Sequence, residues 1–97
     1  MNARVVSIQI QPGKTSEAVS MYRDSVVPAA KQQKGFKSAL LLTDPTTGKG
    51  FSVTVWETEA DMTAGEASGY YQEQIAKFGA VIAAPPVREH YEVSVQA

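Results

Sequence analysis

The stretch FKSALLLTDPTTGKGFSVTVWE, residues 36–57, contains two runs of apolar and β-branched residues with a polar segment between them. The runs at 36–43 and 51–57 are typical of β-strands. The intervening DPTTGKG supplies the proline, aspartate and glycine that favour a turn. The sequence therefore predicts a pair of strands joined by a turn at the centre of the chain.

The segment at the amino end predicts another strand. In ARVVSIQIQPGK, residues 3–14, Val6, Ile8 and Ile10 alternate with polar residues. Such alternation is typical of a half-buried strand, and the Pro-Gly pair that follows indicates a turn.

A helix is predicted between this strand and the central pair. Either Thr15 or Ser16 can cap its start. Apolar residues then recur at three- and four-residue spacing on one face, namely Ala18, Tyr22, Val26, Ala29 and Ala30. We expect a kink at Pro28, which has no amide hydrogen to donate, and an end at Gly35.

The chain after residue 57 predicts a second helix and a last strand. TEAD, residues 58–61, fits the capping pattern in which Ser or Thr precedes an acid by three residues. The helix should break at Ser68–Gly69, resume through YYQEQIAKF, and end before Pro85 and Pro86. VREHYEVSV, residues 87–95, reads as the final strand.

The predicted order is β-α-β-β-α-β, the split-βαβ or ferredoxin-like arrangement. We therefore expect one α+β domain over residues 1–97, with a four-stranded antiparallel sheet and two helices on one face. Val5 and part of the Leu40–Leu42 run point to the other, uncovered face. That apolar face predicts a twofold homodimer packed sheet against sheet, a dimeric α-β barrel, and leaves further assembly open.

Composition excludes several classes of function. The chain has no cysteine, so disulfides and thiolate chemistry are excluded. Its formal charge is −1 and it lacks a basic block, so nucleic-acid binding is not expected. No apolar run approaches the ~20 residues of a membrane span. We expect a cytoplasmic protein without a membrane partner.

Aromatic residues are the main candidates for a site. Trp56, at the end of a strand, either walls an aromatic pocket or fills the gap between strand and helix. Tyr70 and Tyr71 diverge by about 100° on a regular helix, so only one, Tyr71, is expected to point inward. A buried phenol needs a hydrogen-bond partner, which a ligand or the core supplies. Tyr22, on the apolar face of the first helix, has the same two interpretations.

The charged candidates are fewer. His90 is the only histidine, and it either takes part in proton transfer or lies at the surface or an interface. One histidine without cysteine is a poor metal site. Glu57, Glu59, Asp61 and Glu66 are explained mostly by the start of the second helix, where negative charge is favoured. The sequence specifies no nucleophile, metal or cofactor.

Four segments together resemble the antibiotic biosynthesis monooxygenase domain family of the dimeric α-β barrel superfamily. They are IQIQPGK, VVPAAKQQKGF, LLLTDPTTGKGFSVTVWETEAD and ASGYYQE, and the similarity extends over nearly the whole chain. The resemblance implies a pocket between sheet and helices, a barrel-like dimer and no obligatory metal or other cofactor. The family includes cofactor-free oxygenases of aromatic polyketides, haem-degrading enzymes and proteins of no known role.

The chain departs from this family at three places. Gly65 stands where many members carry a histidine, about nine residues after the tryptophan that matches Trp56. Val6 stands near the asparagine of haem-degrading members, and the second helix has no tryptophan. These departures argue against haem degradation and against proton abstraction by a histidine on that helix.

Two functions are consistent with the sequence. The first is a monooxygenase of a small aromatic or quinol substrate, whose pocket includes Trp56, Tyr22, Tyr71 and His90. The second is a non-catalytic, dimeric module that binds a ligand or serves in a stress response. The substrate and the catalytic residues are not specified by the sequence.

Overall fold

The computed structural model describes all residues from 1 to 97. The elements follow the predicted order, although each helical segment is divided. They are β1 (Asn2–Gln9), α1 (Thr15–Met21), the π-helical turn η1 (Tyr22–Val26), α2 (Val27–Lys31), β2 (Phe36–Thr43), β3 (Lys49–Trp56), α3 (Glu59–Ala67), α4 (Tyr70–Lys77) and β4 (Val87–Glu92).

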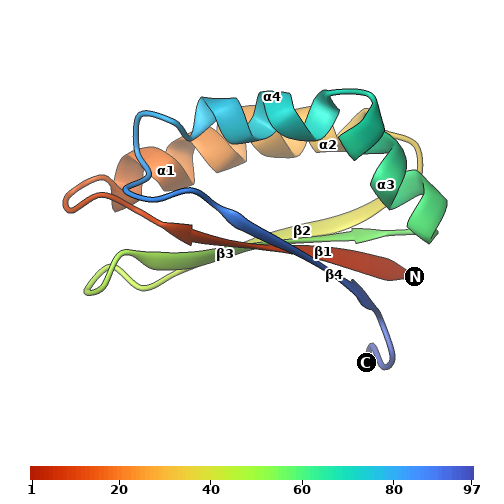
Figure 1. Cartoon of the computed structure of the whole chain (residues 1–97). Coiled ribbons are helices and arrows are strands. Elements are labelled where there is room, and N and C mark those ends of the chain that lie inside the picture. The colour runs from red at the N-terminus through yellow and green to blue at the C-terminus, as the bar shows by residue number, and fades with distance from the viewer.

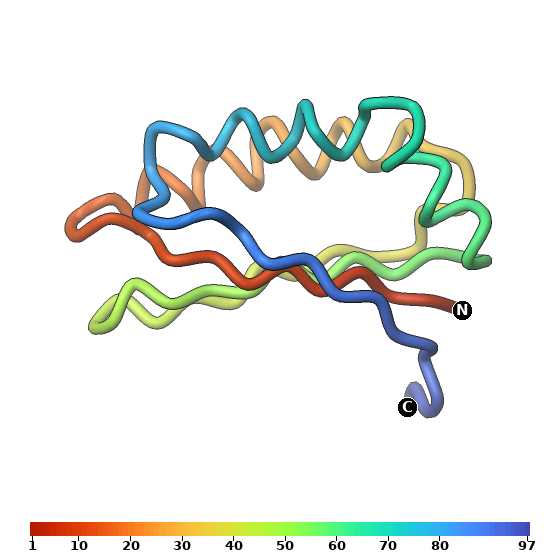
Figure 2. The backbone as a smooth tube through the Cα atoms, viewed as in Figure 1, coloured from red at the N-terminus to blue at the C-terminus, as the bar shows by residue number.

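The four strands form one antiparallel sheet in the order β2-β3-β1-β4. Every helix lies on the same face of this sheet (Figure 1). The backbone tube shows that only the C-terminal end of the chain descends on the other side (Figure 2). The predicted ferredoxin-like α+β fold is confirmed.

Strand register determines which side chains lie beneath the helices. Arg4 on β1 is level with Thr54 on β3 and His90 on β4. Because side chains alternate along a strand, Val6 and Ile8 point to the same face as Arg4. The covered face of β1 therefore carries one cation followed by the apolar residues of the core.

The first helical segment changes its hydrogen-bonding pattern just before Pro28. The Val27 amide donates to the carbonyl of Tyr22, five residues back, so the turn from Tyr22 to Val26 is π-helical. Pro28 lies in the first turn of α2 and has no amide hydrogen, and the wide turn upstream accommodates it. Single π-helical turns are frequent at functional sites, and this one places Tyr22 and Val26 in the interior.

The helix boundaries agree only in part with the prediction. Thr58 caps α3, and its Oγ1 accepts a hydrogen bond from the Asp61 amide at 3.0 Å. The predicted break occurs at Gly69, whose φ of 90° is readily adopted only by glycine. The prediction of a cap at Thr15 or Ser16 is wrong, because α1 begins at Thr15 and its N-cap residue makes no side-chain hydrogen bond.

The last strand is shorter than predicted. It ends at Glu92, whereas the apolar alternation extends to residue 95. Glu92 pairs with Asn2, the first residue of β1, so the neighbouring strand ends there. One further backbone bond, from the Val93 amide to the Met1 carbonyl at 2.9 Å, closes the ladder.

The core lies between the sheet and the helices. Its largest cluster of buried apolar side chains comprises Val6, Ile8, Ile10, Ala18, Tyr22, Val26, Phe78 and Val81. The opposite face of the sheet carries large apolar side chains that are each at least half exposed, namely Leu40, Leu42, Val87 and Tyr91. No helix in the chain combines the length and the apolar character that crossing a membrane would require.

Candidate functional site

A small cavity lies within this core, between β1, β3, η1 and α4. Its volume is about 40 Å³. Since one water needs at least about 10–15 Å³ of such space, the cavity has room for about three. Most of its lining is apolar or aromatic, and the members are Arg4, Val6, Ile8, Tyr22, Val26, Ser52, Thr54, Tyr70, Tyr71, Gln74, Ile75 and Phe78.

Tyr22 brings a hydroxyl to the floor of this cavity. The π-helical turn directs its side chain onto the sheet, where the hydroxyl lies 3.1 Å from Ser52 Oγ and donates to the Leu40 carbonyl at 3.3 Å. Burial raises the pKa of Tyr22 above its ordinary value, against the smaller lowering effects of Ser52 and Arg4. Tyr22 is therefore a neutral phenol near pH 7 and can donate a hydrogen bond.

Tyr70 and Tyr71 both line the cavity, so the prediction that only one points inward is wrong. They open α4 immediately after Gly69, and the cavity extends along the helix far enough to meet two diverging side chains. The ring of Tyr70 lies against Gly65, and the ring of Tyr71 lies beneath Arg4. Burial raises the pKa of both phenols.

Trp56 is fully buried but does not line the cavity. Its indole N–H donates to Thr54 Oγ1 at 3.0 Å, which satisfies its only polar atom. Its ring packs edge-on against Phe36 and Tyr70, with centroids 5.7 and 6.5 Å apart. Trp56 thus fills the space between the end of β3 and the helices, and it packs against Arg4 and Tyr70, which line the cavity.

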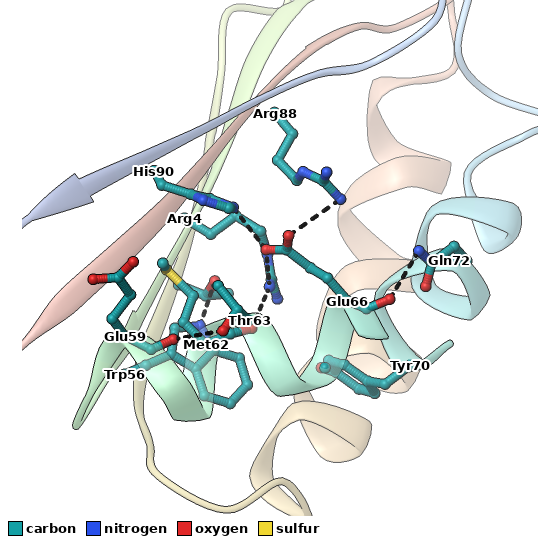
Figure 3. Close-up of polar contacts among 12 residues, drawn as sticks. Arg4, Trp56, Glu59, Met62, Thr63, Glu66, Tyr70, Gln72, Arg88 and His90 are labelled. Carbon is teal, nitrogen blue, oxygen red and sulfur yellow. Dashed lines mark hydrogen bonds and ion pairs between the residues drawn. The ribbon is translucent and has the colours of Figure 1, made fainter. Parts of the chain in front are cut away.

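Next to the cavity, four charged or ionisable side chains meet in what we call the Glu66 cluster: Arg4, Glu66, Arg88 and His90 (Figure 3). Glu66 Oε2 accepts from Arg4 Nη1 at 3.1 Å and lies 2.7 Å from His90 Nε2. Glu66 Oε1 lies 3.4 Å from Arg88 Nη1. One carboxylate therefore joins β1, α3 and β4.

Arg4 is the buried member of the cluster. Only 4% of its surface is exposed, whereas the side chains of Arg88 and His90 are 40% and 36% exposed. The guanidinium lies over the rings of Trp56 and Tyr71, with Cζ 5.4 and 4.8 Å from their centroids. Such cation–π contacts compensate part of the cost of burying the charge.

The structure brings two of the four predicted pocket residues together on the cavity. Tyr22 and Tyr71 line it, from η1 and α4. Trp56 lies one layer behind, and His90 reaches Glu66 from the exposed side of the cluster. Glu66 and Arg4 stand between His90 and the cavity, so this histidine has no direct contact with the space where a ligand would lie.

Sequence reasoning missed Arg4 and misassigned Glu66. Glu66 lies in the last turn of α3, where the helix dipole disfavours a negative charge, so the helix start does not explain it. Its partners Arg4, Arg88 and His90 explain it instead. A signal for Arg4 was present, since it shares the inward face of its strand with Val6 and Ile8. No group of three or more acidic or histidine side chains has a geometry suited to a metal ion.

Comparisons with known proteins agree with this fold. The family model described as antibiotic biosynthesis monooxygenase matches residues 1–77. No curated protein sequence matches the chain.

Several solved structures share the fold over almost their whole length. An arginine-to-serine mutant of MhuD, with two manganese protoporphyrin IX bound per active site, is 18% identical, with 100% of this chain and 98% of that chain covered and a TM-score of 0.79. A monooxygenase from the gene ActVA-Orf6 of Streptomyces coelicolor, in complex with nanaomycin D, is 17% identical, with coverage of 99% and 89% and a TM-score of 0.75. A Nitrosomonas europaea protein of unknown function is 19% identical, with coverage of 99% and 91% and a TM-score of 0.76. At these identities the likeness concerns the fold alone.

Proposed function

Because the chain belongs to the antibiotic biosynthesis monooxygenase family, we propose that it is an oxygenase of a small, electron-rich aromatic or quinol compound. The substrate binds in the cavity between sheet and helices, and its own deprotonated form reduces dioxygen. The observation that carries this proposal is a mostly apolar, aromatic cavity bordered by a buried arginine. Such a lining excludes water from a bound ring and favours an anionic form of it.

The chemistry balances without an external reductant. When a methylene group flanked by aromatic rings becomes a carbonyl, one oxygen atom enters the substrate and the other leaves as water. The four electrons that reduce dioxygen come from the two C–H bonds that are lost. The chain has only to bind the substrate, favour its anion and hold it beside dioxygen.

The lining offers no group that accepts a proton near pH 7. Burial raises the pKa of Tyr22, Tyr70 and Tyr71, so all three are neutral donors. Arg4 carries a guanidinium, which has only hydrogen-bond donors, and the remaining polar groups of the lining are amide and hydroxyl. The substrate must therefore be acidic enough to lose its proton to water, with Arg4 stabilising the anion.

An aromatic substrate requires the cavity to open. A cavity that admits benzene measures ~150 Å³, whereas this one measures about 40 Å³. Tyr70 and Tyr71, at the start of α4, are only half-buried, and they follow Gly69, the point where the two helices join. We expect the first turn of α4 to move outward about this glycine when the substrate binds.

A second copy of the chain completes the proposed enzyme. Leu40, Leu42, Val87 and Tyr91 form an exposed apolar surface on the sheet, which we call the bare face. Packing two bare faces against each other would remove this surface from water and produce the barrel-like dimer.

A second candidate function is binding of the same kind of ligand without turnover. It is favoured by the absence of a base on the cavity and by Gly65, which leaves α3 without an ionisable side chain where it contacts the ring of Tyr70. Both functions need the same cavity, and turnover distinguishes them.

Oxygen consumption tests the proposed function. The purified protein is incubated with hydroquinones and with polyketide anthrones while dissolved oxygen and product are followed. We expect Tyr22→Phe and Tyr71→Phe each to lower kcat/KM by roughly tenfold, because each removes a phenol hydroxyl from the lining of the cavity where the substrate anion is proposed to bind.

Tyr91→Phe is the matched control, since it removes the same hydroxyl from the bare face. Rates that are equal in all three variants would place the reaction outside this cavity. Tight binding without oxygen uptake would support the non-catalytic function instead.

A further inference from the structure

The guanidinium of Arg4 is only partly used by the protein. Its side-chain hydrogen bonds both come from Nη1, to the Met62 carbonyl at 3.1 Å and to Glu66 Oε2 at 3.1 Å. Nε and Nη2 have no protein partner. These two nitrogens carry the parallel N–H groups with which arginine binds both oxygens of a carboxylate.

Nε and Nη2 of Arg4, which together we call its free edge, face the cavity. No fully buried side-chain nitrogen or oxygen in the chain lacks a hydrogen-bond partner, so Nε and Nη2 must reach accessible space. Arg4 is almost completely buried, and the space it borders is the cavity. An unpaired donor pair on a buried cation is costly unless a ligand or water satisfies it.

Aromatic stacking on the guanidinium and the positive charge of the Glu66 cluster both favour binding of an anion at this edge. The rings of Trp56 and Tyr71 lie over the guanidinium and fix its plane, so little side-chain entropy is lost when a ligand binds. Glu66 is the only acid of its cluster and is shared with Arg88 and His90. The cluster therefore keeps an excess positive charge of at least one beside a mostly apolar cavity.

We propose that the ligand of this cavity carries a carboxylate group, bound side-on by Nε and Nη2 of Arg4. This inference rests on the proposed function for the choice of the cavity as the substrate site, and it adds the charged group by which the substrate is recognised. The two oxygens of a carboxylate match the spacing of the N–H groups on Nε and Nη2, which form a fork, whereas a phenolate has only one oxygen. The cavity as it stands admits an ion the size of formate, and a larger acid requires the outward movement of α4.

Ligand binding can be measured by the fluorescence of Trp56, because this is the only tryptophan and its ring lies beside Arg4. Its fluorescence is followed while formate, acetate and benzoate are titrated at constant ionic strength. Acetamide and benzamide serve as neutral analogues of the same shape. We expect the acids to bind and the amides to bind roughly tenfold more weakly or not at all.

Two variants distinguish hydrogen bonding by Arg4 from general attraction of an anion to positive charge. Arg4→Met removes the donors, and Arg88→Met removes an arginine that also contacts Glu66 and Tyr71 but does not line the cavity. We expect binding to be lost in the first and retained in the second. Arg4→Lys keeps the charge without the fork, and should weaken binding by roughly tenfold.

A direct measurement on the unaltered protein covers the case in which Arg4 variants do not fold. The Nε–H signal of Arg4 in proton–nitrogen correlation spectra should shift downfield with acetate and stay in place with acetamide. Equal binding of acids and amides, an unmoved Nε–H signal, or equal losses in the Arg4→Met and Arg88→Met variants would overturn the proposal. Since none of these assays involves turnover, the carboxylate site can fail while oxygenase activity is present, and the reverse.

Benzoate that binds at least as tightly as acetate would identify the carboxylate as part of an aromatic substrate. Binding of formate and acetate alone would identify a small free acid as the ligand. Either result supports a carboxylate on Arg4.

Discussion

The two faces of the sheet differ in the side chains that they carry. Beneath the helices, one row across the strands is polar: Arg4, Thr54 and His90. On the bare face the neighbouring row includes Val5 and Val53, and still larger apolar side chains nearby remain exposed. In an isolated subunit, the covered face thus holds one polar row beside its apolar core, while apolar side chains of the bare face are exposed to water.

This difference separates two roles. A buried polar group is stable only when it is paired, and in this row Glu66 pairs with Arg4 while Trp56 donates to Thr54. Nε and Nη2 of Arg4 remain without a protein partner and can bind a ligand. An exposed apolar surface contributes to stability only when a partner covers it. On the proposed function, the covered face binds the ligand and the bare face forms the dimer.

The largest expected effect concerns the bare face. Leu40→Glu places a charge on β2 within the proposed interface and, by twofold symmetry, does so twice. Loss of the burial of two leucines should weaken the dimer by about 3–6 kcal/mol, before the cost of burying the charges is added. Sedimentation equilibrium at micromolar concentration should then give the mass of one subunit.

Gln32→Glu introduces the same charge at an exposed position after α2 and should leave the dimer intact. A stable single subunit in the unaltered protein would contradict the comparison of the two faces, since the bare face would then need no partner.

The next effect concerns the covered face. Glu66→Ala leaves the buried guanidinium of Arg4 without its counter-charge, and should lower the free energy of unfolding by about 3–5 kcal/mol. Glu57→Ala is the matched control, because it removes the same type of side chain from the exposed ion pair with Lys37. Exposed pairs contribute little, so no measurable change is expected there. Urea unfolding followed by Trp56 fluorescence measures both, and equal effects would show that the burial of Arg4 does not matter.

Much of this fold was predictable because its signals are local. Alternation predicted the strands, and the spacing of Ala18, Tyr22 and Val26 predicted the inner face of the first helix. The apolar character of both sheet faces followed from the same alternation, before the helices were placed. Tyr22 and Tyr71 were found as candidates because an aromatic side chain on an inner helical face has few other places to lie.

The charged part of the site was not predictable in the same way. Glu66 and Arg4 are 62 residues apart in the chain, and only the register of β1 together with the position of α3 brings them into contact. Helix position alone gave Glu66 a local explanation, which was wrong. Tyr70 was missed because the angle between neighbouring helical residues says nothing about the length of the cavity beneath them.

The smallest effect distinguishes the faces through their tyrosines at alkaline pH. Burial raises the pKa of Tyr22 in the folded chain above the value of about 10 that an unfolded tyrosine has. The unfolded chain therefore loses this proton first. The stability that the neutral phenol contributes is complete below pH ~10 and is lost as the pH rises from the unfolded toward the folded pKa. Tyr22→Phe should lower stability by about 1 kcal/mol at neutral pH through its lost hydrogen bonds, and should flatten the decline above pH 10.

The contrasting residue is Tyr91 on the bare face, whose pKa is raised by its hydrogen bond to Glu89 and by the charge of that acid. In the monomeric Leu40→Glu background Tyr91 stays exposed to water, which screens the effect of Glu89, so Tyr91→Phe should flatten the alkaline decline much less than Tyr22→Phe does. Urea unfolding between pH 8 and pH 11, at equal ionic strength, gives the slope for each variant. Equal flattening by the two substitutions would mean that water reaches Tyr22 as freely as it reaches Tyr91, and the covered face would then not provide the dry cavity on which substrate binding depends.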